Sequence, residues 1–299
     1  MKVTVFTKSA NDPRFDSVLR QFANGVRTVG DDVDICEEME YRDCDVAVFF
    51  GSWKNRNMPH HIVKNDIVSK AKNFIVLETP LLGRMPVKEI MQDNWYRIGL
   101  NGFLADTGKF NNQNSDGSRW QIVQECLDIT VAPYTYKYDG PVILPLQLPG
   151  DASLQGASIE KWALQTVIQI REITSRPVVI RTPQLERAFD KYYMKRLRNI
   201  PNVVFQQGSA ENLVGTLSAA YCSVVYSSGF SIDSLVHGCP TIACSPSNFC
   251  YELVDNTVEN IEKVSRPDRT QLFCDLSYAQ WHVAEIEKGL PWKHLKKLF

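Results

Sequence analysis

The chain lacks the signatures of several common protein classes. No G-x-G-x-x-G follows its first apolar run, where the sequence reads FTKSANDPRF, and no P-loop occurs, so dehydrogenases with a dinucleotide fingerprint and P-loop NTPases are excluded. No uninterrupted apolar run of roughly 18 residues is present, and the first residues do not have the pattern of a signal peptide. We therefore expect a soluble, cytoplasmic protein.

Paired cysteines and excess charge are also absent. The eight cysteines lie mostly within apolar segments and include no C-x-x-C pair, which predicts reduced core residues. The formal net charge is −1, so the overall charge gives no argument for binding nucleic acid or an anionic membrane. Two Asp-x-Asp matches, at 32–34 and 43–45, come before predicted strands. This position favours turns over a metal motif, and no bound metal is predicted.

What the sequence does contain is a twofold alternation of strands and helices over 299 residues. The first half predicts strands at 2–7, 33–36, 45–50 and 73–78, helices at 15–29 and 118–129, and an irregular region at 79–116. The second half predicts strands at 141–147, 176–182, 202–208 and 223–226, and helices at 158–174, 183–198, 211–221, 231–237 and 268–289. Such alternation predicts an α/β protein with two Rossmann-like, doubly wound parallel-sheet domains, 1–135 and 136–299, facing a central crevice.

The segment 223–246, SVVYSSGFSIDSLVHGCPTIACSP, is the most informative part of the second half. It predicts a strand, then a turn of Ser227, Ser228 and Gly229, then a helix beginning at Ser231, and a second strand after Gly238-Cys239-Pro240. A small-residue turn before a helix brings backbone N–H groups close to an anion. This arrangement is therefore typical of a phosphate-binding site.

The same segment resembles the donor-binding segment of glycosyltransferases of the GT-B type, in which a serine- or glycine-rich turn precedes an acidic residue and Gly-x-Pro. The resemblance implies that the turn binds the diphosphate of a nucleotide sugar such as a UDP-sugar. It also implies that Asp233, where the family more often has Glu, holds ribose or sugar hydroxyls. The end of the chain resembles the terminal helices that in GT-B enzymes pack back on the first domain.

Further motifs extend the resemblance to phage and capsule-region proteins with GT-B folds: NWYRIGLNGF, QLPGDASLQG, RPVVIRTP and QWHVAEIEKGLPWKHL. The phage members imply transfer of a hexose or pentose to 5-hydroxymethylcytosine in double-stranded DNA. A surface or capsular glycan is the alternative acceptor, and a non-catalytic nucleotide-sugar or sugar-binding module is the alternative without turnover.

Other predicted donor residues lie where strands of the second half end. Arg181 ends the strand RPVVIRT, where its guanidinium is placed to bind phosphate in a bidentate manner. The resemblance implies that Gln147 lies near the donor, and that Gln207 and Gly208 contact the nucleotide base. Leaving-group stabilisation by Arg181 and the helix start at Ser228 makes a metal unnecessary in this scheme.

Transfer to a hydroxyl also needs a base, and two carboxylates of the first half are candidates. Asp106, in the turn-rich segment NGFLADTGKF, is the first choice, and Glu78, which ends an apolar strand, is the second. On the acceptor side, Ser52 and Trp53 follow another strand, and Trp95 and Tyr96 supply aromatic rings that would support an extruded base if DNA is the acceptor.

Overall fold

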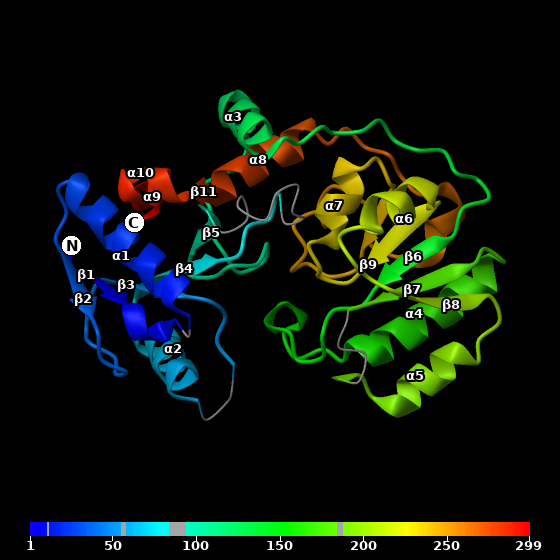
Figure 1. The fold of residues 1–299 in the computed structure, drawn as a ribbon, viewed down its shortest axis with the longest axis horizontal. Helices are drawn as coiled ribbons and strands as arrows, with labels where there is room; N and C mark the ends of the chain where they lie inside the picture. The colour runs from blue at the N-terminus through cyan, green and yellow to red at the C-terminus, as the bar shows by residue number, and fades with distance from the viewer. Residues whose placement is uncertain (11, 55–57, 84–93, 184–187) are drawn as a thin grey trace. The chain divides into compact units, whose positions relative to one another are not determined.

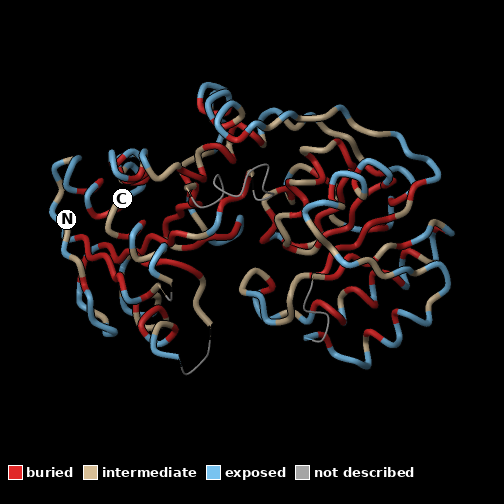
Figure 2. The backbone as a smooth tube through the Cα atoms, in the orientation of Figure 1, coloured by how far each residue is buried: buried red, intermediate tan, exposed pale blue. Residues whose placement is uncertain are grey.

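The computed structural model describes residues 1–10, 12–54, 58–83, 94–183 and 188–299. The chain divides into two compact units (Figure 1). The first unit contains Met1–Leu127 and Phe273–Phe299, and the second contains Asp128–Leu272. In each unit the inner strands of the sheet are buried along most or all of their length, whereas the edge strands β2 (Val33–Cys36) and β8 (Val203–Gln207) include exposed residues (Figure 2).

The first unit is built on a six-stranded sheet with the order β11-β5-β4-β3-β1-β2. Its strands are β1 (Val3–Phe6), β2 (Val33–Cys36), β3 (Val46–Phe50), β4 (Asn73–Glu78), β5 (Trp95–Leu100) and β11 (Gln280–His282). β1 to β4 run parallel, β5 is antiparallel to β4, and β11 is antiparallel to β5. The parallel strands therefore end at one common edge, called here the carboxyl edge of the first sheet.

The expectation of an irregular region at 79–116 was wrong where β5 forms. Tyr96, Ile98 and Leu100 alternate along β5 and join the core on one face of the sheet. Residues 84–93, which precede it, lie outside the described residues.

Helices cover both faces of this sheet. They are η1 (Thr7–Ser9), α1 (Pro13–Thr28), α2 (Pro59–Lys70), α3 (Ser118–Leu127), α8 (Thr270–Ala279), α9 (Val283–Glu287), α10 (Leu290–Leu295) and η6 (Lys296–Leu298). α1 begins where the Asp12 carboxylate accepts the Arg14 N–H at 2.9 Å. α1 and α9 pack very closely, because a Cβ on Gly25 would lie 2.1 Å from the Ile286 carbonyl oxygen.

The terminal segment completes the first unit. The single helix expected at 268–289 was wrong, since β11 interrupts it and pairs with β5. His282 and Glu285 form a capping box that restarts the helix as α9. Arg119 of α3 anchors the segment, with Nη1 2.5 Å from a Glu285 oxygen and its guanidinium carbon 3.8 Å from the centre of the Trp281 ring.

The second unit has a five-stranded parallel sheet with the order β10-β9-β6-β7-β8. Its strands are β6 (Val142–Pro145), β7 (Val178–Thr182), β8 (Val203–Gln207), β9 (Cys222–Val225) and β10 (Thr241–Ala243). Its helices are η3 (Ala152–Leu154), α4 (Ile159–Ile173), α5 (Lys191–Arg198), α6 (Leu213–Ala219), α7 (Phe230–Val236) and η5 (Val258–Lys263). All five strands end at one edge, the carboxyl edge of the second sheet.

The α/β fold class is thus confirmed, with two Rossmann-like sheets of which the first includes the antiparallel β5. The helix expected at 183–198 is shorter than predicted. The Asp190 side chain accepts the Tyr192 N–H, so α5 begins at Lys191, and residues 184–187 lie outside the described residues. All eight cysteines are free thiols. In the described part of the chain, no helix combines the length and apolar character needed to cross a membrane.

Candidate donor and acceptor sites

Three polar side chains meet at the carboxyl edge of the second sheet, two from the connection between β6 and α4 and one from the turn after β9. The Gln147 amide nitrogen, just beyond β6, donates to Ser153 Oγ at 2.5 Å and to Ser227 Oγ at 3.2 Å. Ser227, which follows β9, returns a hydroxyl bond to Gln147 Oε1 at 3.3 Å. Asp151 fixes Ser153 by accepting its hydroxyl at 2.7 Å. The structure therefore brings the predicted residues Gln147 and Ser227 together in one hydrogen-bond network, in which Asp151 bonds to Ser153.

Asn248, which no sequence motif indicated, holds the serine turn from its other side. This residue is 2% exposed. Its Oδ1 accepts the Ser231 hydroxyl at 2.8 Å, and its Nδ2 donates to the Ser228 and Tyr226 carbonyl oxygens, each at 3.3 Å. The turn is thereby fixed before any ligand binds. The only available signal was the turn-forming run SPSN after the last strand.

Arg181 lies at the same edge, at the end of β7, and is 7% exposed. Its Nη1 donates to Asn212 Oδ1 at 3.0 Å and its Nη2 to the Ser209 carbonyl oxygen at 2.6 Å. A Cβ on Gly208 would lie 2.6 Å from Nη1, so a larger residue there would displace the guanidinium from this position. Arg181 thus binds the turn between β8 and α6 from inside.

The remaining predicted donor residues lie around this turn and the serine turn. Asp233 is half-buried in the first turn of α7, and its carboxylate opposes the lowering of the pKa of Arg181 that burial causes. Gln207 is exposed, and its carbonyl oxygen accepts the Asn212 amide at 2.9 Å. Ser228 Oγ accepts the Phe230 N–H at 3.2 Å, while Gly229 precedes α7.

Glu78 is the centre of a second polar group, at the carboxyl edge of the first sheet. Its Oε2 accepts the Ser52 N–H at 3.1 Å and its Oε1 accepts the Thr79 N–H at 2.9 Å. A carboxylate has about four lone-pair positions, so each oxygen keeps an acceptor position. Arg97 of β5 is the register partner of Glu78 across the strand pair.

Lys64, in the middle of α2, brings a buried amino group to the same place. It is 5% exposed, and its Nζ donates to the Ser52 carbonyl oxygen at 3.3 Å. A Cβ on Gly51 would lie 3.2 Å from that nitrogen. Burial lowers the pKa of Lys64 to about 8, and the Glu78 carboxylate opposes this shift. Sequence reasoning missed Lys64, because a lysine in a helix normally indicates a solvated face.

The aromatic residues predicted for the acceptor side have different environments. Trp53 is half-buried and makes edge contacts with Phe74 and Phe103, with ring centres 5.7 and 5.6 Å apart. Trp95 and Tyr96, in contrast, belong to β5 and are 3% and 6% exposed. The structure therefore leaves Trp53 near Ser52 and gives the other two rings core contacts.

Asp106 is exposed, in the turn between Leu104 and Gly108. The turn follows β5, which runs antiparallel to β4. The chain therefore leaves β5 at the edge opposite to the one where Glu78 ends β4. Among the described residues, no three or more His, Cys, Asp or Glu side chains gather as potential metal ligands.

No family model matches the sequence, and no curated protein matches it significantly. Two solved structures from Thermosulfurimonas dismutans share the fold along almost the whole chain. One is KpsC, beta Kdo 2,4 transferase, with 14% identity and a TM-score of 0.59, covering 94% of this chain and 92% of that chain. The other is KpsC, beta Kdo 2,7 transferase, with 12% identity and a TM-score of 0.54, covering 98% and 100%. The likeness shows a GT-B fold.

Proposed function

We propose that the protein is a glycosyltransferase that moves a sugar from a nucleotide-activated donor to a hydroxyl group of a glycan. The observation that carries this proposal is the network of Gln147, Ser153 and Ser227 at one edge of a parallel sheet, next to the serine turn that Asn248 holds. Ligands of open α/β sheets bind beyond the carboxyl ends of the strands. The two structures with the same fold are both named as Kdo transferases, which supports the choice of reaction and of a glycan acceptor.

The donor is held on the second unit in this proposal. The serine turn offers hydroxyl and backbone N–H groups of Ser227 to Gly229 to the phosphate, while Asp233 accepts hydroxyl protons of ribose or sugar. Arg181 acts by keeping the turn after β8 in place, since its two terminal nitrogens already bond to Asn212 and Ser209. Pre-fixed donors of this kind stabilise the negative charge of a leaving nucleotide.

The proton step falls to the first unit. Glu78 accepts the proton of the acceptor hydroxyl, the oxygen attacks the anomeric carbon, and the bond from that carbon to the phosphate oxygen breaks. The N–H groups of Ser52 and Thr79 orient the carboxylate. Glu78 is preferred here over Asp106 because it lies at the carboxyl edge and is held from two sides.

The test is mass spectrometry of acceptors incubated with the protein and a panel of nucleotide-activated hexoses, pentoses and Kdo. Neutral and acidic capsular oligosaccharides and DNA containing 5-hydroxymethylcytosine are the acceptors. A sugar mass on a glycan is the expected result, and a sugar mass on DNA alone would replace the glycan with the nucleobase. We expect turnover to persist in EDTA.

Arg181→Ala is the matching donor variant. We expect weaker donor binding by calorimetry, because the turn after β8 loses its internal support. No mass increment on any acceptor, together with no nucleotide sugar that raises the melting temperature, would contradict the transferase and favour a module of another function.

A further inference from the structure

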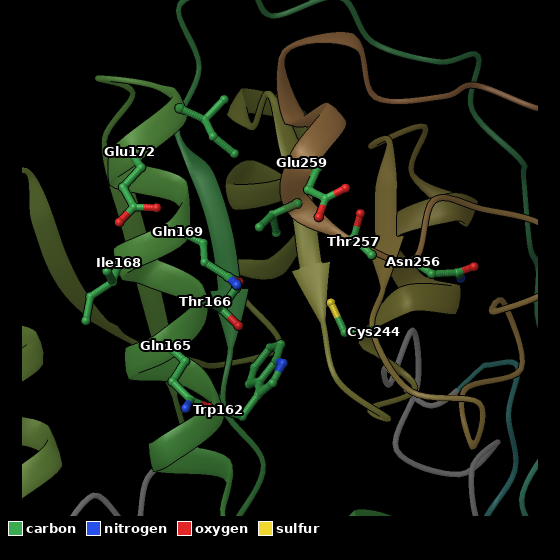
Figure 3. A pocket seen from close by; sticks show the side chains of 12 residues that line it. Trp162, Gln165, Thr166, Ile168, Gln169, Glu172, Cys244, Asn256, Thr257 and Glu259 are labelled. Atoms are coloured by element: carbon green, nitrogen blue, oxygen red, sulfur yellow. The ribbon is translucent and has the colours of Figure 1, made fainter.

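The second unit contains a groove of about 710 Å³ whose lining includes none of Gln147, Ser153 and Ser227, although its Cys244 end adjoins the carboxyl edge of the second sheet. It lies between α4 and the segment 256–259 that leads into η5 (Figure 3). Its volume falls within the range of about 300–1,000 Å³ that is typical of ligand sites. Along α4 the lining extends from Trp162 to Ile173, a length of about 16 Å at the helical rise per residue. The groove is therefore elongated.

One end of the groove is a rigid aromatic surface. Trp162 is half-buried, and its ring centre lies 5.4 Å from that of Tyr226 at an interplanar angle of 58°. Figure 3 shows the Trp162 ring projecting from α4 toward the opposite wall. An indole held in this way offers an apolar face with a polar edge. Such a face suits the C–H groups of a sugar ring.

Polar side chains are regularly spaced along the rest of the α4 wall, which also includes Ile168 and Ile173. Gln165, Gln169 and Glu172 follow Trp162 at intervals of three or four residues, which places them on one side of the helix. All three are exposed. Thr257 and Glu259 face them from the other wall (Figure 3). Amide, hydroxyl and carboxylate groups on two walls can bond a row of hydroxyls that both donate and accept.

The charge of the groove narrows the ligand class further. Two glutamates and no lysine, arginine or histidine line it. Phosphate, nucleic acid and acidic sugars would meet like charge without a compensating cation. A neutral, polyhydroxylated chain can contact the aromatic end, the amides and the carboxylates without charge repulsion.

We propose that this groove binds a neutral oligosaccharide, with one sugar ring stacked on Trp162 and the following hydroxyls bonded by Gln165, Gln169 and the two glutamates. The inference goes beyond the proposed function and does not depend on it, because the groove binds without donor or turnover. In a transferase, it would keep a long glycan attached and so raise the effective concentration of its acceptor end.

The experiment is calorimetric titration of the full chain, without nucleotide sugar, with neutral hexose, pentose and N-acetylhexosamine oligomers of two to seven units and with acidic oligomers of equal length. We expect at least one neutral series to bind, more tightly as the chain lengthens. Trp162→Ala should weaken this binding at least tenfold. The matched control is Tyr192→Ala, which removes an aromatic ring that is 61% exposed on α5 and should leave affinity unchanged.

A second variant guards against an effect of Trp162 on folding. Gln169→Arg changes an exposed residue that is not part of the Trp162–Tyr226 ring pair, and it should also weaken neutral glycan binding at least tenfold. The proposal is overturned if no neutral oligomer binds, if both variants bind as the wild type does, or if acidic oligomers bind more tightly through the same residues. Loss of self-association in Trp162→Ala by sedimentation, without any glycan binding, would assign the groove to a second copy of the chain.

Discussion

The carboxyl edges of the two sheets hold different kinds of polar groups. At the second sheet, the hydroxyl and amide groups of Gln147, Ser153 and Ser227 bond to one another, and the charged side chains of Asp151 and Arg181 beside them are bonded to neighbouring turns. At the first sheet, Glu78 and the buried Lys64 share the Gly51-Ser52 turn. A neutral and mutually bonded network suits binding over a wide pH range, whereas buried charges cost stability and occur where protons are moved. The groups of the second edge therefore suit ligand binding, and those of the first edge suit proton transfer.

The largest expected effect is a loss of turnover when the Glu78 carboxylate at the carboxyl edge of the first sheet is replaced. Glu78→Gln keeps the shape and one of the two backbone contacts, since the amide nitrogen cannot accept an N–H. The substitution removes the base, so kcat should fall by about 10²–10⁴, while the donor Kd stays within twofold. Asp106→Asn is the matched variant and should retain most of the activity. Steady-state kinetics with calorimetry would separate these outcomes; loss of turnover in Asp106→Asn with normal Glu78→Gln would exchange the roles of the two residues.

Lys64→Met should change stability and its pH dependence. The lysine titrates near 10.5 when unfolded and near 8 when folded, so between these values the unfolded state binds more protons and stability rises with pH. Below pH 8 the full cost is present, about 3 kcal/mol for such a shift. Met should therefore raise the free energy of unfolding at pH 7 by about 1–3 kcal/mol and remove the rise between pH 8 and 10.5.

Denaturant unfolding from pH 6 to 10.5 measures this effect. Lys70→Met on the same helix is the control, since Lys70 is exposed and pairs with Asp66 at the surface. Its effect should stay within about 0.5 kcal/mol. A destabilised Lys64→Met protein at pH 7 would mean that the bond to the Ser52 carbonyl outweighs the burial of the charge.

The smallest effect is expected for a hydroxyl of the Gln147, Ser153 and Ser227 network at the second sheet. Ser227→Ala removes hydroxyl bonds to Gln147 and Ser153, which should lower the free energy of unfolding by about 1 kcal/mol and weaken donor binding by up to tenfold. Because none of these groups titrates near neutral pH, the donor Kd should change little from pH 6 to 9. Calorimetry at several pH values, with Ser175→Ala as an exposed control, measures this; a steep pH dependence lost in Ser227→Ala would remove the distinction between the edges.

Local pattern was sufficient to predict most of the fold. Val33–Cys36 and Asn73–Glu78 match the observed strands residue for residue. A short alternating segment such as VDIC and a short β-branched apolar run such as FIVL both favour a strand. β5 was missed because Arg97 and Gly99 alternate with its core residues among aromatics and asparagines. β11 was missed because its strand conformation depends on pairing with β5, a partner about 180 residues away that no local pattern reveals.

The candidate site was predictable only in its chain positions. Parallel topology places Gln147, Arg181, Gly208 and Ser227 at one edge, as strand ends must be. The sequence does not show that the Arg181 guanidinium is already bonded, because its partners Asn212 and Ser209 lie about 30 residues away in the turn after β8. Asn248 and Lys64 were missed for a related reason, since their roles come from burial against distant segments and not from any motif.

The return of residues 273–299 to the first unit has a consequence for synthesis. The second unit is one continuous stretch, Asp128–Leu272, whereas the first sheet obtains β11 and the helices α9 and α10 only from the end of the chain. During translation, the N-terminal strands therefore emerge first, but the outer edge of β5 stays unpaired until β11 has been made. The later half becomes a complete folding unit earlier. On the ribosome, the order in which the two cores close is thus the reverse of the order in which their first strands are made.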